Sequence, residues 1–229
     1  MKNFEKKHVH AFYEESSKEF SATRYKMWPK VEHFYSKYVK NTDVILDAGS
    51  GNGRNTLHPL RTVSLDYSKG LLGIAKEKQS GMMYARHDLG DVFPIRAGVF
   101  DICISIAVIH HLSTSERREA SVRHMIESLK TGGHCMIYVW SESPESKPSK
   151  FLSISNISNP GIEKIDNLTG NDVFVGWKST NNLNRYYHLF RTNELEDIIA
   201  KCPVEILESG KDHGNYYVIC RKTASTNNK

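Results

Sequence analysis

Residues 44–53 read Val-Ile-Leu-Asp-Ala-Gly-Ser-Gly-Asn-Gly, an apolar run that ends in an acid and then in three alternating glycines. The run Val44–Asp47 predicts a short buried strand, and the glycines predict a tight turn where the backbone can approach a ligand closely, because no Cβ intrudes. Nineteen residues after Asp47, Asp66 follows a second strand-like run, Thr62–Leu65. Two such strands are typical of a doubly wound α/β sheet, which binds its ligands at the carboxyl ends of its strands.

The same alternation continues along the chain. Helical patterns open at Pro29, Ser68 and Ser115, and Gly132-Gly133 are expected to end the third of these helices. One short helix fits between the first two strands, and another is expected near residues 192–202. Further strands are expected at these segments: Met82–Arg86, Phe100–Ala107, His134–Trp140, Val204–Glu208 and Tyr216–Arg221. The last two are close enough to require a hairpin, so we predict an α/β, doubly wound, mostly parallel seven-stranded sheet with an antiparallel C-terminal hairpin.

Composition narrows the class of protein. The chain has 229 residues and a net charge of 31 − 26 = +5, which favours an anionic partner. No stretch approaches the ~20 apolar residues of a membrane span, and the N-terminus lacks the apolar block of a signal peptide. We therefore expect no membrane association and a cytoplasmic location, with the nucleus as a second compartment. The four cysteines form no Cys-x-x-Cys pair, so we expect buried reduced thiols and no metal in this chain.

The glycine-rich turn excludes two common phosphate ligands. The residue three after Gly51 is Arg54, so the dinucleotide fingerprint is absent, and no Gly-Lys-Ser/Thr follows. The Asp47 carboxylate would repel a pyrophosphate but attract an ammonium, and Asp66 can accept hydrogen bonds from ribose hydroxyls. A cationic adenosine without phosphate, S-adenosylmethionine, fits this pattern. The alternative is a tight strand-to-helix turn with an incidental acid.

This layout resembles the class I S-adenosylmethionine-dependent methyltransferases over about residues 28–222, a Rossmann-like fold. The resemblance implies that the glycines hold the methionine moiety, that Asp66 binds the ribose, and that Asp88 with Leu89 binds the adenine. The cofactor-binding residues implied are Asp47, Gly49, Gly51, Gly53, Asp66, Asp88, Leu89 and Ala107. Residues 1–27 are then expected to form an N-terminal helical extension or lid, 141–184 a substrate-side insertion within the methyltransferase domain, and 223–229 a disordered tail.

Four further segments carry a narrower resemblance. They are Thr23-Arg24-Tyr25-Lys26-Met27-Trp28-Pro29, Ile104-Ser105-Ile106-Ala107-Val108-Ile109-His110-His111, Asp172-Val173-Phe174-Val175-Gly176-Trp177 and Arg185-Tyr186-Tyr187-His188-Leu189-Phe190-Arg191. Together they look like the tRNA wobble-uridine carboxymethyl methyltransferases. That resemblance implies esterification of 5-carboxymethyluridine in the tRNA anticodon loop and a small zinc-binding activator subunit. In the usual strand order of this fold, Gly81–His87 is a poorly protected edge, so we expect the activator there.

Candidate substrate residues follow from these segments. Arginine can bind a carboxylate bidentately, histidine can donate directionally, and aromatic rings can stack on an extruded base. The expected catalytic residues are Arg24, His110, Arg185 and His188, and the expected substrate-binding residues are Tyr13, Trp177, Tyr186 and Tyr187. Each has a structural alternative. His110 could be satisfied by a nearby backbone group, Tyr13 could pack against the sheet instead of covering the cofactor, and one of Tyr186 and Tyr187 could be a core residue.

Two other functions remain open. A small-molecule carboxyl or O-methyltransferase would share the cofactor site but need an enclosed pocket in place of a basic cleft. A non-catalytic S-adenosylmethionine-binding scaffold subunit would need no catalytic residues at all. The dispersed basic residues of the first forty positions are compatible with tRNA, although only seven residues separate Trp177 from Arg185, where related enzymes carry a long charged insertion.

Overall fold

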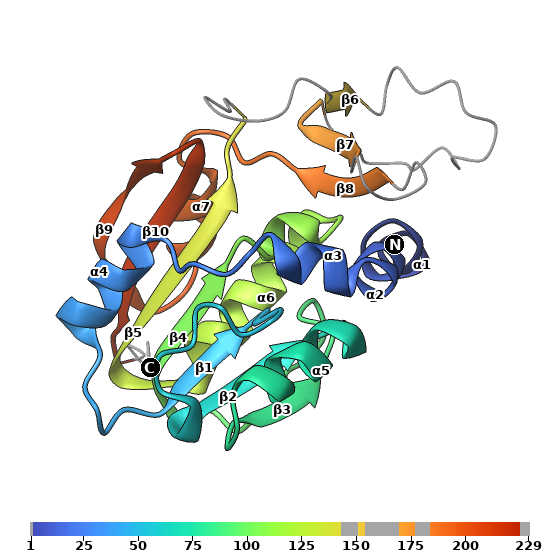
Figure 1. The fold of residues 1–229 in the computed structure, drawn as a ribbon. Coiled ribbons are helices and arrows are strands. Elements are labelled where there is room, and N and C mark those ends of the chain that lie inside the picture. The colour runs from blue at the N-terminus through green and yellow to red at the C-terminus, as the bar shows by residue number, and fades with distance from the viewer. Residues whose placement is uncertain (1, 143–150, 154–169, 177–183, 225–229) are drawn as a thin grey trace.

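A seven-stranded sheet forms the centre of the protein, for which we have a computed structural model that describes residues 2–142, 151–153, 170–176 and 184–224. Its strands are β1 (Ile45–Ala48), β2 (Thr62–Asp66), β3 (Met83–Arg86), β4 (Phe100–Ile106), β5 (Leu129–Trp140), β9 (Val204–Asp212) and β10 (Asn215–Lys222). They lie in the order β3-β2-β1-β4-β5-β10-β9, as Figure 1 shows. Only β10 runs antiparallel to its neighbours, so the predicted fold class and closing hairpin are confirmed.

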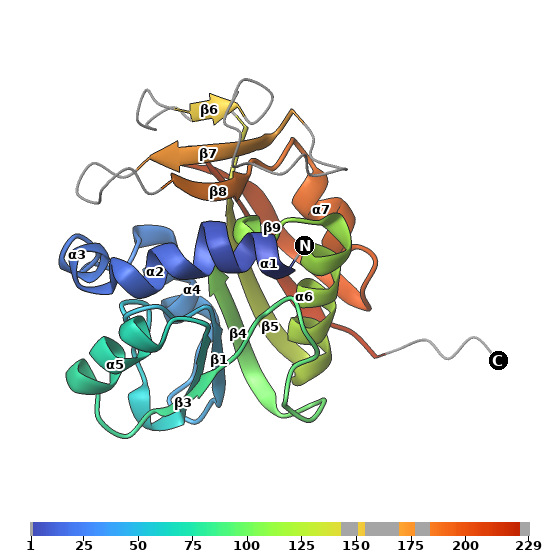
Figure 2. The same cartoon turned by 90° about the vertical axis from the view of Figure 1, so that its right-hand side faces the viewer.

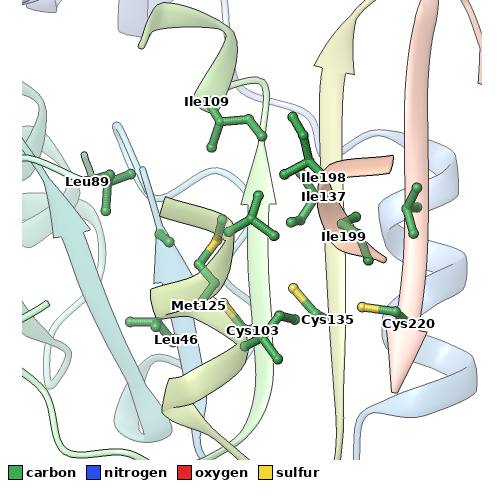
Figure 3. Close-up of a cluster of buried hydrophobic side chains, with 14 of the residues drawn as sticks. Leu46, Leu89, Cys103, Ile109, Met125, Cys135, Ile137, Ile198, Ile199 and Cys220 are labelled. Atoms are coloured by element: carbon green, nitrogen blue, oxygen red, sulfur yellow. The ribbon is translucent and has the colours of Figure 1, made fainter. Parts of the chain in front are cut away.

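Alternate residues of the central strands enter two separate cores. On one face, Ile45, Ile104 and Tyr138 pack with Val31 and Phe34 of α4 (Pro29–Tyr38). On the other face, the residues that alternate with these pack against α6 (Ser115–Ser128) and α7 (Glu194–Ile199). They include Leu46, Cys103, Cys135, Ile137 and Cys220 (Figure 3). This period of two is what a sheet covered by helices on both faces requires. The cysteines are free thiols, three of them buried and Cys202 half-buried.

Helix α5 (Lys69–Lys78) begins as expected from its capping residue. The Ser68 hydroxyl accepts a hydrogen bond from the Leu71 amide at 3.2 Å, which satisfies one of the free donors of the first turn. The short helix expected between β1 and β2 is only a 3₁₀ turn, η2 (Pro59–Arg61). The prediction that Gly132-Gly133 end α6 was wrong, because the helix ends at Ser128 and both glycines lie within β5.

A second, three-stranded antiparallel sheet lies beyond the carboxyl end of β5, in and just after the predicted substrate-side insertion. It consists of β6 (Phe151–Ser153), β7 (Asp172–Gly176) and β8 (Asn184–His188), in that order. In β7 and β8, Asp172 pairs with His188 and Phe174 with Tyr186. Most of the predicted insertion, residues 141–184, lies outside the described residues.

Short helices at the N-terminus lie between the small sheet and α5 (Figure 2). They are α1 (Lys2–Glu5), the π-helical turn η1 (Lys6–His10), α2 (Ala11–Glu15) and α3 (Ser17–Ala22), and a second 3₁₀ turn, η3 (Ile109–His111), follows β4. Val9 packs with Phe174 and Tyr186 of the small sheet. The N-terminal segment therefore contacts the strand ends at which ligands bind in this fold. In the described part of the chain, every helix is too short or too polar to cross a lipid bilayer.

Candidate active site

The glycine turn after β1 forms one side of a cavity of about 110 Å³ at the carboxyl ends of β1 and β4. Gly49 and Gly51 line this cavity with positive φ angles of 91° and 55°, a region that glycine adopts without strain. A Cβ on Gly49 would lie 2.3 Å from a methyl group of Val108, so only glycine fits there. Gly53 is different: a Cβ there would meet Ala75 and Gln79 of the α5 region, so this glycine allows the turn to pack on the helix.

Asp66 lies at the end of β2 and organises the turn. One carboxylate oxygen accepts a hydrogen bond from the Gly51 amide and the other from the Ser68 amide, both at 2.8 Å. Burial raises the pKa of Asp66, although these amides oppose the shift. The side chain lines both the first cavity and a second one of about 80 Å³, so it can reach a ligand that spans the two.

The second cavity adjoins the first, and both are lined by Gly49, Val108 and His111. Asp88 and buried Leu89 line it from the segment after β3, and Val9 and His10 line it from η1. The His10 ring stacks on Tyr67 with centroids 3.5 Å apart, and burial lowers the pKa of His10 to about 4. The predicted adenine residues therefore lie in an apolar and aromatic recess next to Asp66.

Asp47 lies in β1, just before the glycine turn, and the hydrogen-bonding capacity of its carboxylate is incompletely satisfied. Its Oδ2 accepts only a long hydrogen bond, 3.4 Å, from Thr56, and its buried Oδ1 has no hydrogen-bond partner. Burial, and then repulsion from Asp66, raise the pKa of Asp47 to about 7. A cationic group in the cavity would favour the ionised form, which is the interaction that the sequence suggested for an ammonium.

A hydrogen-bonded chain joins the N-terminal helices to β8 across the first cavity. His111 Nδ1 lies 2.9 Å from the Tyr186 carbonyl, so it carries the proton, and Nε2 must accept from the Tyr13 hydroxyl at 2.8 Å. The Tyr13 oxygen in turn accepts from Arg185 Nη1 at 3.1 Å. Burial lowers the pKa of His111 to about 3, so its ring is neutral. Tyr13 is thus both a packing residue and part of the cavity wall.

Three arginines repel one another in a group that reaches the first cavity through Arg54. Arg54 lines it, and Arg185, only 2% exposed, lies with its guanidinium 4.4 Å from the Phe12 ring. Burial lowers the pKa of Arg54 to about 10, and repulsion from Arg24 adds to the effect. Burial and then repulsion from Arg185 lower the pKa of Arg24. An anion bound among these groups would relieve that repulsion.

Other predicted substrate residues lie away from the two cavities. His110 Nδ1 accepts a hydrogen bond from the Trp140 amide at 3.1 Å, which is the structural alternative that the sequence left open. His188 lies between two carboxylates, with Asp172 at 2.9 Å and Glu194 at 2.7 Å. The Tyr186 hydroxyl donates to Asp172, while Tyr187 stacks on Trp140 with centroids 4.2 Å apart. Trp177 lies outside the described residues.

Three residues that the sequence reasoning passed over belong to the site. His111 and Arg54 line the first cavity, whereas their neighbours His110 and Gly53 had been selected. The third is Glu5, which has no exposed surface and binds Arg117 at 2.9 Å, while Arg117 also binds Asp88 at 2.7 Å. Glu5, His10 and Asp88 present possible ligand atoms within 4.8 Å of one another, but both carboxylates already bind Arg117. No sequence signal connected Glu5 with Arg117, 112 positions later.

Comparison with known proteins finds related methyltransferases. A family profile described as a methyltransferase domain matches residues 46–137, which include the glycine turn and β4. The chain is 32% identical to the tRNA (carboxymethyluridine(34)-5-O)-methyltransferase of Schizosaccharomyces pombe over 96% of this chain and 98% of that protein. The chain belongs to the tRNA (carboxymethyluridine(34)-5-O)-methyltransferase family. It is also 36% identical, over 96% of its length and 97% of the relative's, to a putative methyltransferase of Encephalitozoon cuniculi.

Other relatives differ in length or only share the fold. Frog, mouse and macaque relatives are longer, and the chain spans less than half of each. Among solved structures, the chain resembles a putative methyltransferase from Haloferax volcanii, crystallised in complex with the Trm112 methyltransferase activator. The TM-score is 0.65 at 13% identity, over 94% of this chain and 98% of the compared chain, which shows the fold alone.

As a member of this methyltransferase family, the protein uses S-adenosylmethionine, and its residues fit that cofactor. The cradle at Gly49 has no room for a Cβ, Asp66 faces both cavities, and the buried Asp47 Oδ1 lacks a partner. When bound, the cofactor supplies a methyl group on a positively charged sulfur. The glycine turn and Asp47 would hold its methionine end, while Asp66, Asp88 and Leu89 would hold its adenosine.

Proposed function

We propose that this enzyme methylates the carboxylate of 5-carboxymethyluridine at the wobble position of tRNA, as the catalytic subunit of a heterodimer. The observation that carries the proposal is the group of Arg24, Arg54 and Arg185, in which Arg54 lines the cavity next to the glycine cradle. Family membership supplies the substrate class, because the Schizosaccharomyces pombe relative is named for this nucleoside.

The chemistry asks little of a general base. A carboxylate with a pKa near ~4 is already ionised at neutral pH, so it can attack a methyl group without losing a proton. The enzyme must remove water from the carboxylate and hold one oxygen about 3 Å from the methyl carbon, in line with the bond that breaks. Arg185 suits this task, because the Tyr13 hydroxyl and the rings of Phe12, Tyr13 and Tyr187 fix its guanidinium.

His111 supports this arrangement without exchanging protons. Its pKa of about 3 keeps the ring neutral throughout the physiological range, and its Nε2 orients the Tyr13 hydroxyl. The oxygen of Tyr13 is then available to Arg185. We propose that His111 and Tyr13 position Arg185, and that the rate changes little with pH near neutrality.

An activator subunit at the β3 edge completes the proposal. β3 is the outer strand of the large sheet, and Met83 on it is 63% exposed. Leu60 and Leu57 are 84% and 51% exposed, and Leu60 lies beside Gly81 at the start of this edge. An exposed apolar strand edge invites pairing with another chain. The fold similarity to a methyltransferase crystallised with the Trm112 activator is compatible with this partner.

The decisive experiment is mass spectrometry of tRNA nucleosides from cells that lack the protein. We expect 5-carboxymethyluridine to accumulate at the wobble position and its methyl ester to disappear. An unchanged nucleoside profile contradicts the proposed substrate. The purified complex should also transfer a methyl group that mild alkali removes, since esters hydrolyse and N-methyl groups do not; absence of any transfer would favour the scaffold alternative.

A variant of Arg185 tests its role in this reaction. Arg185→Gln removes the charge and keeps most of the side-chain length, so we expect unchanged cofactor affinity and a loss of methyl transfer of about 100-fold or more. Calorimetry with S-adenosylmethionine and single-turnover methylation measure the two quantities separately. Equal losses in both would show that Arg185 serves the fold and not the substrate.

A further inference from the structure

Tyr25 is the one aromatic residue among the strongly exposed large hydrophobic side chains of the described part of the chain. Its side chain is 74% exposed, whereas the aromatic rings of Phe20 and Trp28, on either side of it in sequence, are half-buried. A large ring left in water is not explained by packing within this chain.

The segment that carries Tyr25 is held at both ends beside the first cavity. At one end, the Asn52 side chain in the glycine turn donates to the Arg24 carbonyl at 2.9 Å and to the Ser21 hydroxyl at 2.8 Å. At the other end, Trp28 packs on Tyr138 with ring centroids 5.3 Å apart, and the Arg54 guanidinium lies 5.0 Å from the Trp28 ring. The turn between these two anchors therefore presents Tyr25 in a defined place.

Both ends of this segment also contact residues that line the cavity. Phe20 lines it, and the Arg24 guanidinium lies 4.4 Å from the Phe20 ring. Arg54, which contacts Trp28, lines it as well. Tyr25 thus lies one residue from a cation next to the cavity, and it faces solvent instead of the cavity interior.

The charge around Tyr25 has one sign. Between Phe20 and Val31 the sequence contains Arg24, Lys26 and Lys30 and no acidic residue. Lys30 is used in an ion pair with Glu208 at 3.0 Å, whereas Lys26 is exposed. An exposed ring flanked by cations is the combination that binds unpaired nucleotides, in which the ring stacks on a base and the cations meet the phosphates.

We propose that Tyr25 is a stacking site for an unpaired nucleobase of the anticodon loop next to the nucleotide being methylated. The target nucleotide must enter the cavity lined by Arg54 to reach the arginine group, so the ring outside the cavity meets a neighbouring base. The exposed Lys26 then binds a phosphate next to that base, while Arg24 stays with the arginine group. This inference rests on the proposed tRNA substrate and adds a contact that neither the cofactor site nor the arginine group supplies.

The test uses the enzyme co-expressed with its activator and an anticodon stem-loop RNA that carries 5-carboxymethyluridine at the wobble position. Fluorescence anisotropy gives the RNA dissociation constant, and calorimetry gives that of S-adenosylmethionine. We expect Tyr25→Ala and Tyr25→Leu to weaken RNA binding by about 5- to 140-fold, the range that stacking on one base supplies. Tyr25→Phe keeps the ring and should bind RNA as the unaltered enzyme does. Ile206→Ala, on exposed β9 at the other edge of the sheet, is the matched control and should change nothing.

Several outcomes overturn the inference. RNA binding unchanged in Tyr25→Ala removes the stacking site, and normal binding by Tyr25→Leu shows an apolar contact without stacking. A loss in Tyr25→Phe equal to that in Tyr25→Ala assigns the effect to the hydroxyl. Weaker activator association or cofactor binding in Tyr25→Ala, with RNA affinity retained, assigns the residue to a protein contact or to the fold. If the unaltered enzyme does not methylate this RNA at all, the proposed function fails and not the stacking site alone.

Discussion

Replacing Glu5 with glutamine should loosen the N-terminal helices from the cofactor site. The Glu5 carboxylate is fully buried and accepts hydrogen bonds from the Ser113 amide and hydroxyl, both at 2.7 Å. It also binds Arg117 through Nε and Nη2, at 3.0 and 2.9 Å. Glutamine has nearly the same shape as glutamate but carries no charge. Its NH2 group would also point a hydrogen-bond donor at the donors of Ser113 and Arg117.

The size of the effect depends on the ion pairs that Arg117 retains when Glu5 is replaced. Breaking a buried ion pair by removing one partner costs about 3–5 kcal/mol. Arg117 retains Asp88 at 2.7 Å and Asp91 at 3.2 Å, so we take the lower end of that range. A loss of about 3 kcal/mol shifts the equilibrium between the closed and open helices by about 140-fold.

Cofactor affinity reports this shift, because the same helices line both cavities through Val9, His10, Tyr13 and Phe20. The dissociation constant of S-adenosylmethionine rises only by the part of the shift that depopulates the closed state, so about 140-fold is its upper limit. Calorimetry measures the constant, and hydrogen exchange measures opening of residues 2–22. Thermal unfolding of the main sheet should change much less than either.

The matched control is Glu119→Gln. Glu119 forms an ion pair of 2.7 Å with Lys201, but both side chains are substantially exposed, so its loss should cost less than about 1 kcal/mol. If Glu5→Gln binds the cofactor with unaltered affinity and its N-terminal amides stay protected, the argument that this ion pair holds the helices closed is refuted.

Three further substitutions and one control test the cofactor cradle and the sheet edge. Gly49→Ala should abolish cofactor binding in calorimetry, since its Cβ would lie 2.3 Å from Val108, whereas Gly73→Ala in α5 has open space and should stabilise the enzyme by about 0.5–1 kcal/mol. The pKa of Asp47 is raised to about 7 in the folded protein, so as pH rises the unfolded chain releases this proton first. The free energy of unfolding without cofactor should therefore fall as pH rises from about 4 to 7 and then level off. Asp47→Asn should flatten this part of the pH profile measured by denaturant unfolding. Met83→Asp on β3 should prevent copurification of the activator without changing cofactor affinity, and unaltered copurification would place the activator elsewhere.

Much of the large sheet could be predicted because each of its strands carries its own signal. Ile45 and Leu46 face opposite cores, and the acids Asp47 and Asp66 mark strand ends that parallel pairing brings to one edge. The small sheet carries no such local signal. Its strands β7 and β8 are short, and they are stabilised by packing on Val9 and Phe4 at the other end of the chain. Strand propensity depends on such neighbours, so residues 141–184 were predicted only as an insertion, and a core position for one of Tyr186 and Tyr187 was left as an alternative.

The histidines show why site residues were harder to predict than the fold. His110, His111 and His188 have the same side chain, and each has a different role that its partners decide. Burial keeps His111 neutral, and the Tyr186 carbonyl and the Tyr13 hydroxyl, 173 positions apart in sequence, fix which nitrogen accepts. His188 instead lies between two carboxylates and joins the small sheet to α7 through Asp172 and Glu194.

The contacts of His188 and of His111 meet at Tyr186, so these two histidines are coupled through that residue. Glu194, His188, Asp172 and the Tyr186 hydroxyl form one hydrogen-bonded series, and the Tyr186 carbonyl begins the second series through His111 and Tyr13 to Arg185. Tyr186 belongs to both, so a change at His188 displaces Arg185 without touching the cavity. Loss of methyl transfer in a His188 variant is therefore expected even though its ring is buried away from the proposed carboxylate, and such a loss alone does not identify a catalytic residue.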